Sequence, residues 1–251
     1  MSAGTLQPAP RNYYTICDTL AAAMDLRTAR LAKGLTQVQA AARLGLSQPY
    51  LAMLESGRRR LTPALARRAM RLYGLSPSLL PPVASASPRR PLAAAALTRD
   101  LAALGYPGLA HLRPRRWTPK NPGEVLLAAL AQDDLDARLV EALPWLLGRY
   151  WPLDREWLVR EAKLQDLQNR LGFVATLARR LAERGGDAPK ARALSELEAA
   201  LDRSRLARED TLCRTSLHPA ERRRLAAHPS EDARRWNLLT DWTADALRYP
   251  A

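Results

Sequence analysis

Apolar residues recur with helical spacing along most of the chain, in segments separated by glycine, proline and short polar residues. Between residues 18 and 80 these segments are short, and we expect Asp18 to cap the first of them. Each of four glycines stands where a helix should stop: Gly34, Gly45, Gly57 and Gly74. No stretch has a convincing strand pattern, so we predict an all-α fold.

A second series of helices is predicted from Asn121 onward. Asn121 can cap a helix whose first turn accommodates Pro122, and Asp133 or Asp134 is expected to begin the next helix. Pro144 lies inside that second helix and should kink or break it. The last two helices are predicted at about residues 220–228 and 230–249.

Between these helices the spacing predicts a hairpin of two long helices. The first spans about residues 155–184, opens at Asp154 and stops at Gly185 and Gly186; the second begins at Asp187. Apolar residues repeat every three or four positions along both, as helix-packing seams do. The seam residues are Leu164, Leu167, Leu171, Val174, Ala178 and Leu181 in the first helix and Leu194, Leu197 and Leu201 in the second.

These patterns divide the chain into four parts. We predict a flexible arm at 1–17, a helical domain at 18–83, a basic proline-rich linker region at 84–120 and a second helical domain at 121–251. The formal net charge of +14 is unevenly distributed, because residues 121–251 hold 21 basic and 21 acidic residues and residues 1–120 carry the whole excess. The first half therefore suits a polyanion, and the second suits folding or protein contacts.

Several classes of function are disfavoured. No apolar run approaches the roughly 18 residues of a membrane span, and the first residues lack the pattern of a secretory signal, so we expect a cytosolic protein. Cys17 and Cys213 are isolated and the three histidines are scattered, so we predict no disulfide framework, metal site or cofactor. No phosphate loop or catalytic triad stands out, and we expect no enzyme.

The most informative stretch is residues 26–81. Thr36 is placed to cap its second helix, Gly45 lies in the following turn where positive φ is needed, and Leu46 is expected to plug the core. Ser47 is placed to cap the third helix. We expect Val38, Ala41, Ala42, Leu44, Leu51 and Leu54 to face inward, and Gln48, Tyr50 and Met53 to point away from the core.

On these residues the stretch, at about 24–80, resembles the DNA-binding domain of the Cro/lambda-repressor-like (XRE) family. The resemblance implies a five-helix domain that binds double-stranded DNA with sequence specificity and lays its third helix in the major groove. It implies a base contact by Gln48 and an ion pair between Arg30 and Glu55. Tyr50 and Met53 are further candidates for base contacts because they are expected to point away from the core, and Tyr50 could instead contribute to packing. The resemblance further implies contacts with the DNA backbone by Gln37, Ser47, Arg58, Arg59 and Arg60. Pro49 stands where the family commonly has a polar residue. Since proline has no side-chain donor, fewer residues of this helix can read bases.

The second half leaves two hypotheses open. In the first, the protein is a dimeric (auto)repressor whose residues 121–251 form the homodimer. In the second, it is an antitoxin whose residues 121–251 neutralise a cognate toxin while the first domain controls the shared promoter. The polar group Asp166, Gln168, Asn169 and Arg170 could form a buried network, a partner-binding patch or plain helix surface, with surface as the default. The tryptophans at 145, 151, 157, 236 and 242 are assigned to the helix core rather than to a ligand.

Overall fold

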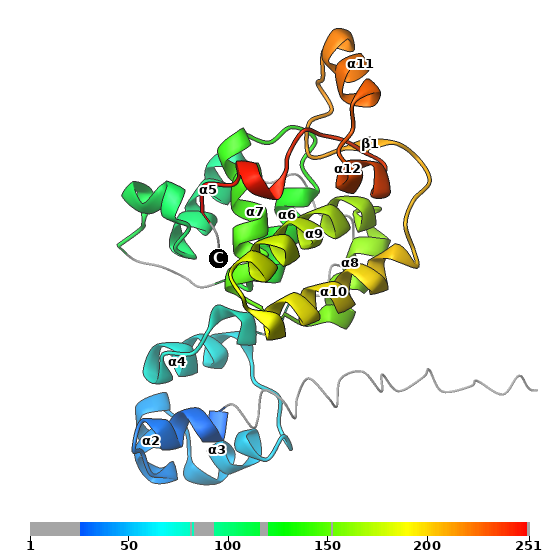
Figure 1. The fold of residues 1–251 in the computed structure, drawn as a ribbon. Helices are drawn as coiled ribbons and strands as arrows, with labels where there is room; N and C mark the ends of the chain where they lie inside the picture. The colour runs from blue at the N-terminus through cyan, green and yellow to red at the C-terminus, as the bar shows by residue number, and fades with distance from the viewer. Residues whose placement is uncertain (1–25, 81, 83–92, 116–119, 152, 250–251) are drawn as a thin grey trace, which may run out of the picture. The chain divides into compact units, whose positions relative to one another are not determined.

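The computed structural model describes residues 26–80, 82, 93–115, 120–151 and 153–249. The chain divides into two compact units, Met1–Pro81 and Pro82–Ala251, each with an apolar core of its own (Figure 1). Helices dominate both units, which confirms the predicted all-α class. The arm predicted at 1–17 and the cap predicted at Asp18 lie outside the described residues.

The first unit is a bundle of short helices. Residues 26–32 are helical, and the elements that follow are α2 (Gln37–Leu44), α3 (Gln48–Glu55), α4 (Pro63–Tyr73) and the 3-10 helix η1 (Pro77–Leu79). The glycine stops are confirmed, because Gly34, Gly45, Gly57 and Gly74 all have φ between 63° and 72°. Leucines from α2, α3 and α4 meet Tyr73 in the core of the unit.

The second unit is a larger helical bundle built around one central helix. Its elements are α5 (Ala94–Ala103), η2 (Pro107–Leu112), α6 (Pro122–Leu130), α7 (Ala137–Arg149), α8 (Arg155–Leu164), α9 (Gln168–Arg184), α10 (Ala188–Asp202), β1 (Asp210–Thr211), α11 (Pro219–Ala227), α12 (Glu231–Arg235), β2 (Leu238–Leu239) and η3 (Ala244–Ala246). Helix α9 contacts α6, α7, α8, α10 and α12, and it lies side by side with α10 in Figure 1. The predicted hairpin of α9 and α10 is therefore present, and Asp187 caps α10 as expected.

The region predicted as a linker at 84–120 differs from the structure over much of its length. Leu97 and Leu101 of α5 are fully buried, and Tyr106 is 1% exposed. All three belong to the core of the second unit, and the Tyr150 hydroxyl donates a hydrogen bond of 2.6 Å to the Leu104 carbonyl. The sequence of this region is rich in proline and arginine, which is typical of a linker, and the apolar residues of α5 form only a short stripe. For these two reasons the sequence did not predict that the region is buried.

The continuous helix predicted at 155–184 is wrong, because the structure breaks it between α8 and α9. Asp166 adopts a left-handed conformation with φ of 56°, and the Leu167 amide donates to the Ala162 carbonyl at 2.8 Å, which closes α8 with a Schellman motif. The break turns Leu164 outward, so that this first residue of the predicted seam is 67% exposed. The other seam residues of both helices are buried inside the unit.

Helix boundaries differ from prediction at two other places. Helix α7 runs through Pro144 without ending there, and its cap is Asp136 rather than Asp133 or Asp134. The helix predicted at 230–249 is only five residues long, because Asn237 has a φ of 51° and the chain then forms β2. Strands β1 and β2 are parallel, with Asp210 opposite Leu238 and Thr211 opposite Leu239.

Three residues of the polar group at the start of α9, Gln168, Asn169 and Arg170, are buried in a hydrogen-bonded network, which corrects the default expectation of helix surface for them. Asp166 is exposed, as that expectation had it. Arg170 holds Asp210 through two hydrogen bonds of 2.8 Å and also donates to the Leu130 and Gln132 carbonyls. The Asn169 side chain donates to the Leu206 carbonyl and accepts from its amide, each at 2.9 Å. These hydrogen bonds hold the segment that follows α10 against the bundle, so the network stabilises the fold of the second unit.

Candidate DNA-binding surface

The turn between α2 and α3 is specified by local hydrogen bonds. The Thr36 hydroxyl accepts from the Gln39 amide at 3.2 Å, and the Gln39 side chain accepts from the Thr36 amide at 3.0 Å, which makes a complete capping box. Gly45 ends α2 with a φ of 66°, and the Ser47 hydroxyl then accepts from the Tyr50 amide at 3.4 Å. Both predicted caps are present, so α3 begins at a fixed position.

The inner faces of the two helices differ in part from prediction. Leu51 and Leu54 are buried as expected, and they anchor α3 to the core. On α2 the buried residues are Ala40, Ala41 and Leu44, whereas Val38 is 67% exposed and Ala42 is also exposed. The assignment of Val38 and Ala42 to the inner face was therefore wrong, because the apolar stripe of α2 is narrower than the apolar composition of its sequence indicates.

The opposite side of α3 carries the residues proposed to read bases. Gln48, Tyr50 and Met53 are all partly exposed, and part of Tyr50 packs against the apolar core of the unit. Pro49 is exposed in the first turn, where proline is compatible with a helix. The helix thus presents one amide, one phenol and one thioether on its accessible side.

Arg30 and Glu55 form a buried bidentate ion pair. Arg30 Nε donates to Glu55 Oε1 at 2.6 Å and Nη2 donates to Oε2 at 3.0 Å, while Nη1 donates to the Leu35 carbonyl at 2.8 Å. Burial opposes ionisation of Glu55, but hydrogen bonds from Arg30 and Gln37 outweigh it and lower the pKa of the carboxyl. The same pair raises the pKa of Arg30. The first helix is therefore tied to the end of α3.

Two glutamines extend this pair to the start of α3. Gln37 Nε2 donates to Glu55 Oε2 at 3.0 Å, and Gln48 Nε2 donates to Gln37 Oε1 at 2.7 Å. The ionised Glu55 can only accept, so the NH₂ group of Gln37 must face it. The Gln37 carbonyl then faces Gln48 and fixes which side of the Gln48 amide remains accessible.

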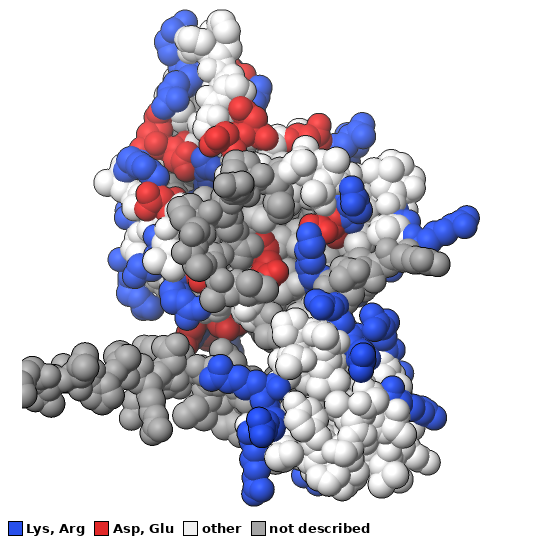
Figure 2. Space-filling model, turned by 180° about the vertical axis from the view of Figure 1, so that it is seen from behind, with Lys and Arg blue, Asp and Glu red and all other residues white. Residues whose placement is uncertain are grey.

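Basic residues surround this side of the unit. Arg58, Arg59 and Arg60 are exposed in the loop after α3, and Arg43 at the end of α2 is exposed as well. Sequence reasoning did not single out Arg43, although its place next to the inward Leu44 predicts exposure. Figure 2 shows lysine and arginine on this unit without accompanying acids, and Glu55 is the only acid from residue 26 to residue 80.

Arg68 has a structural contact that the sequence did not reveal. Its Nη1 donates to the Leu44 carbonyl at 3.3 Å, and so satisfies a free carbonyl at the end of α2. Arg71 is exposed and Arg67 is partly exposed on the same helix. The α4 arginines therefore brace the bundle at one point and add positive charge to its surface.

Comparison with protein families agrees with this geometry. A family model described as "Helix-turn-helix" matches residues 26–80. Over these residues the chain is therefore similar to helix-turn-helix domains, in agreement with the resemblance to the XRE type. The match supports a DNA-binding regulator of transcription, and it covers about a fifth of the chain. Neither the curated proteins nor the solved structures contain a match to this chain.

The described residues contain neither a cluster of metal ligands nor a helix suited to a membrane. No three His, Cys, Asp or Glu side chains in that part of the chain gather in an arrangement that would hold a metal ion. Among the described helices, none has both the length and the apolar content needed to cross a membrane.

Proposed function

We propose that this protein is a sequence-specific regulator of transcription that reads the major groove of double-stranded DNA with α3. The observation that carries the proposal is the chain of hydrogen bonds from Arg30 through Glu55 and Gln37 to Gln48. It holds a polar side chain in one orientation at the accessible start of a helix that has the length and exposure to enter the groove.

The orientation of Gln48 fits recognition of adenine. One N–H of its amide is used by Gln37, so its carbonyl oxygen and second N–H remain for a ligand. An acceptor beside a donor is the pattern that pairs bidentately with N6 and N7 of adenine. We therefore propose Gln48 as the principal base reader, with Tyr50 and Met53 making apolar contacts to neighbouring bases.

The surrounding groups suit the DNA backbone. Arg58, Arg59 and Arg60 supply exposed guanidinium groups in the loop after α3, and Ser47 lies at the start of α3. Gln37 begins α2, and its side chain contacts Gln48. Such contacts position a protein on the duplex and make its affinity dependent on salt, without reading sequence. We propose phosphate contact as the role of all five residues.

We further propose that two copies act together on a two-fold operator and repress transcription. One eight-residue helix reaches only a few base pairs, whereas two helices on successive turns of the groove, about 34–36 Å apart, read a site long enough to be specific. Repression is the simplest result, because occupancy of a promoter excludes the polymerase without any further machinery.

The test is a comparison of full-length variants on a duplex selected from random sequence. Gln48→Ala should lose about 1–3 kcal/mol on the selected site, confined to one base position of each half-site, with unchanged affinity for unrelated DNA. Arg59→Ala is the matched control: it should weaken binding to every sequence alike and lower the salt slope by about one. Equal weakening of all sequences by Gln48→Ala would refute its role in base reading.

A further inference from the structure

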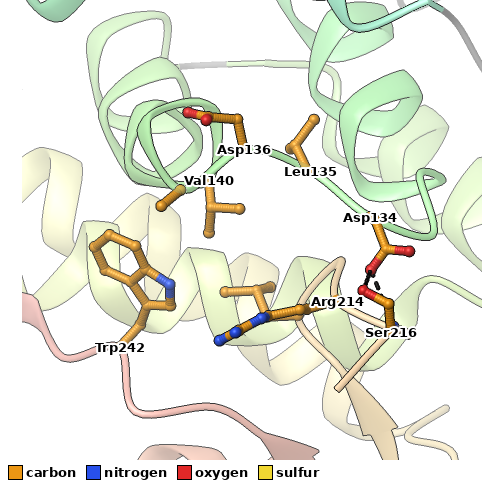
Figure 3. Close-up of a pocket in the computed structure, with 9 residues that line it drawn as sticks. Asp134, Leu135, Asp136, Val140, Arg214, Ser216 and Trp242 are labelled. Carbon is orange, nitrogen blue, oxygen red and sulfur yellow. Dashed lines mark hydrogen bonds between the residues drawn. The ribbon is translucent and has the colours of Figure 1, made fainter. Parts of the chain in front are cut away.

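The second unit contains a surface hollow of about 520 Å³ that neither the helix-turn-helix nor the packing of the bundle uses. It lies where the start of α7 meets the chain around Arg214 and Trp242 (Figure 3). Known small-molecule sites occupy roughly 300–1,000 Å³, so the hollow has the size of a ligand site. Leu135, Val140 and Leu212 supply apolar walls.

Two carboxylates are held on the segment that leads into α7. Asp136 Oδ1 accepts from the Arg138 amide at 2.9 Å, as the cap of the helix. Asp134 Oδ1 accepts from the Ser216 amide at 3.0 Å and from its hydroxyl at 2.8 Å, and these hydrogen bonds lower the pKa of Asp134. Asp134 is therefore ionised at neutral pH, and backbone geometry fixes both side chains in position.

The charge of the hollow is negative. The guanidinium of Arg214 reaches into it in Figure 3, but Glu221 already holds this group through hydrogen bonds of 2.8 and 3.0 Å. Within the described part of the chain, no ion pair includes Asp134 or Asp136. The charge of Arg214 is thus paired with Glu221, whereas the two aspartates have hydrogen-bond donors but no cationic side chain paired with them in the described part of the chain.

Trp242 completes the site. Its indole ring lies along the hollow in Figure 3. The side chain packs against the core, as expected from sequence, but it is only partly buried and so also lines the hollow. The face of an indole attracts cations and also packs well against apolar groups. We propose that this hollow binds a small organic cation with an apolar or aromatic body: the carboxylates hold its charge, and Trp242 with the aliphatic walls holds its body.

Calorimetric titration of the full chain without DNA tests the charge preference. Three probes of similar body are compared: benzyltrimethylammonium, the neutral 3-phenylpropanol and the anionic 3-phenylpropionate. The cation should saturate one site per chain and bind at least tenfold more tightly than the anion, with the alcohol between them. Equal binding of all three probes, or tighter binding of the anion, would overturn the proposal.

Variants locate the site. Asp134→Asn and Asp136→Asn keep the acceptor oxygen that each position needs and remove only the charge, so each should weaken benzyltrimethylammonium up to about fivefold. Asp133→Asn is the matched control, because it removes the same charge one residue away and outside the lining of the hollow. Trp242→Leu should also weaken the cation. If Asp133→Asn has the same effect as the other two, or Trp242→Leu has none, the cation binds elsewhere and the proposed site is wrong.

Discussion

At the scale of single residues, Arg30 joins the first helix of the DNA-binding unit to the end of α3 through a buried ion pair. Arg30→Ala leaves the Glu55 carboxylate buried without its main partner, and a broken buried pair typically costs about 3–5 kcal/mol. We expect this loss in thermal unfolding of residues 1–81, followed by circular dichroism. Arg71→Ala, which removes an exposed guanidinium from the same unit, is the control and should change stability by less than about 0.5 kcal/mol.

Acid should weaken the same unit through Glu55. Its pKa in the folded state lies below the unfolded value of about 4.3, so the stabilisation is complete above that pH and is lost as pH falls through the folded pKa. Melting of residues 1–81 should therefore show Glu55→Gln less stable than the native sequence at pH 7, with the difference shrinking below about pH 4. A difference that stays constant down to pH 2 would contradict the link to Glu55 ionisation.

At the scale of elements, caps and glycines were the features that the sequence predicted well. Thr36, Ser47, Asn121 and Asp154 each cap a helix as expected, because these contacts span two or three residues and need no tertiary partner. The site residues could be anticipated only through the family resemblance. The hydrogen bonds that join Gln37, Gln48 and Glu55 depend on how α2 and α3 meet in the folded unit.

The break between α8 and α9 shows why other boundaries were missed. The apolar spacing continues in helical period from Leu164 through Leu167 to Leu171, so the pattern contains no interruption. The chain breaks because tertiary contacts favour it: Asn169 and Arg170 bind a segment about 40 residues later in the sequence. The same explanation applies to Leu164, whose apolar character gave no hint of its exposure.

Helix α9 can lie close to Trp236 only because Gly172 has no side chain. A Cβ at this position would stand 2.3 Å from two atoms of the indole, which is fully buried and donates to Thr176 Oγ1 at 2.9 Å. Gly172→Ala should therefore destabilise the second unit by at least about 1–3 kcal/mol. Urea unfolding followed by tryptophan fluorescence reports on this unit, since every tryptophan of the chain lies after residue 82.

The control for this substitution is Gly185→Ala at the end of α9. There an added Cβ meets its nearest neighbour, the Leu181 carbonyl, at 3.4 Å, and the backbone conformation is right-handed. Its stability should stay within about 0.5 kcal/mol of the native protein. If the stability of Gly172→Ala is also within about 0.5 kcal/mol of the native protein, α9 does not pack as closely against Trp236 as the structure indicates.

At the scale of the whole molecule, we expect a fragment that begins at the boundary between the two cores to fold independently. Residues 82–251 include α5, whose Leu97 and Leu101 are fully buried, whereas a fragment that begins at residue 121 lacks them. We expect the longer fragment to unfold cooperatively and the shorter one to lose stability by several kcal/mol, because two leucines and Tyr106 leave the core. Circular dichroism of both fragments during heating measures the difference.

The oligomeric state of the chain and of its fragments tests whether the second unit mediates dimerisation while the first binds DNA. The hypothesis of a dimeric repressor places self-association in residues 121–251. The leucine seams of α9 and α10 are buried inside one chain, so two copies in this fold would have to meet through other surfaces. We expect residues 1–81 to be monomeric and to bind a half-site weakly with strong salt dependence, because one recognition helix cannot fix the spacing of two. The full chain should sediment as a dimer and bind a two-fold operator far more tightly, while residues 82–251 should self-associate without binding DNA.

If the full chain and residues 82–251 are both monomeric, the second unit does not mediate dimerisation. That result would favour the hypothesis of an antitoxin that binds a different protein over the hypothesis of a dimeric repressor.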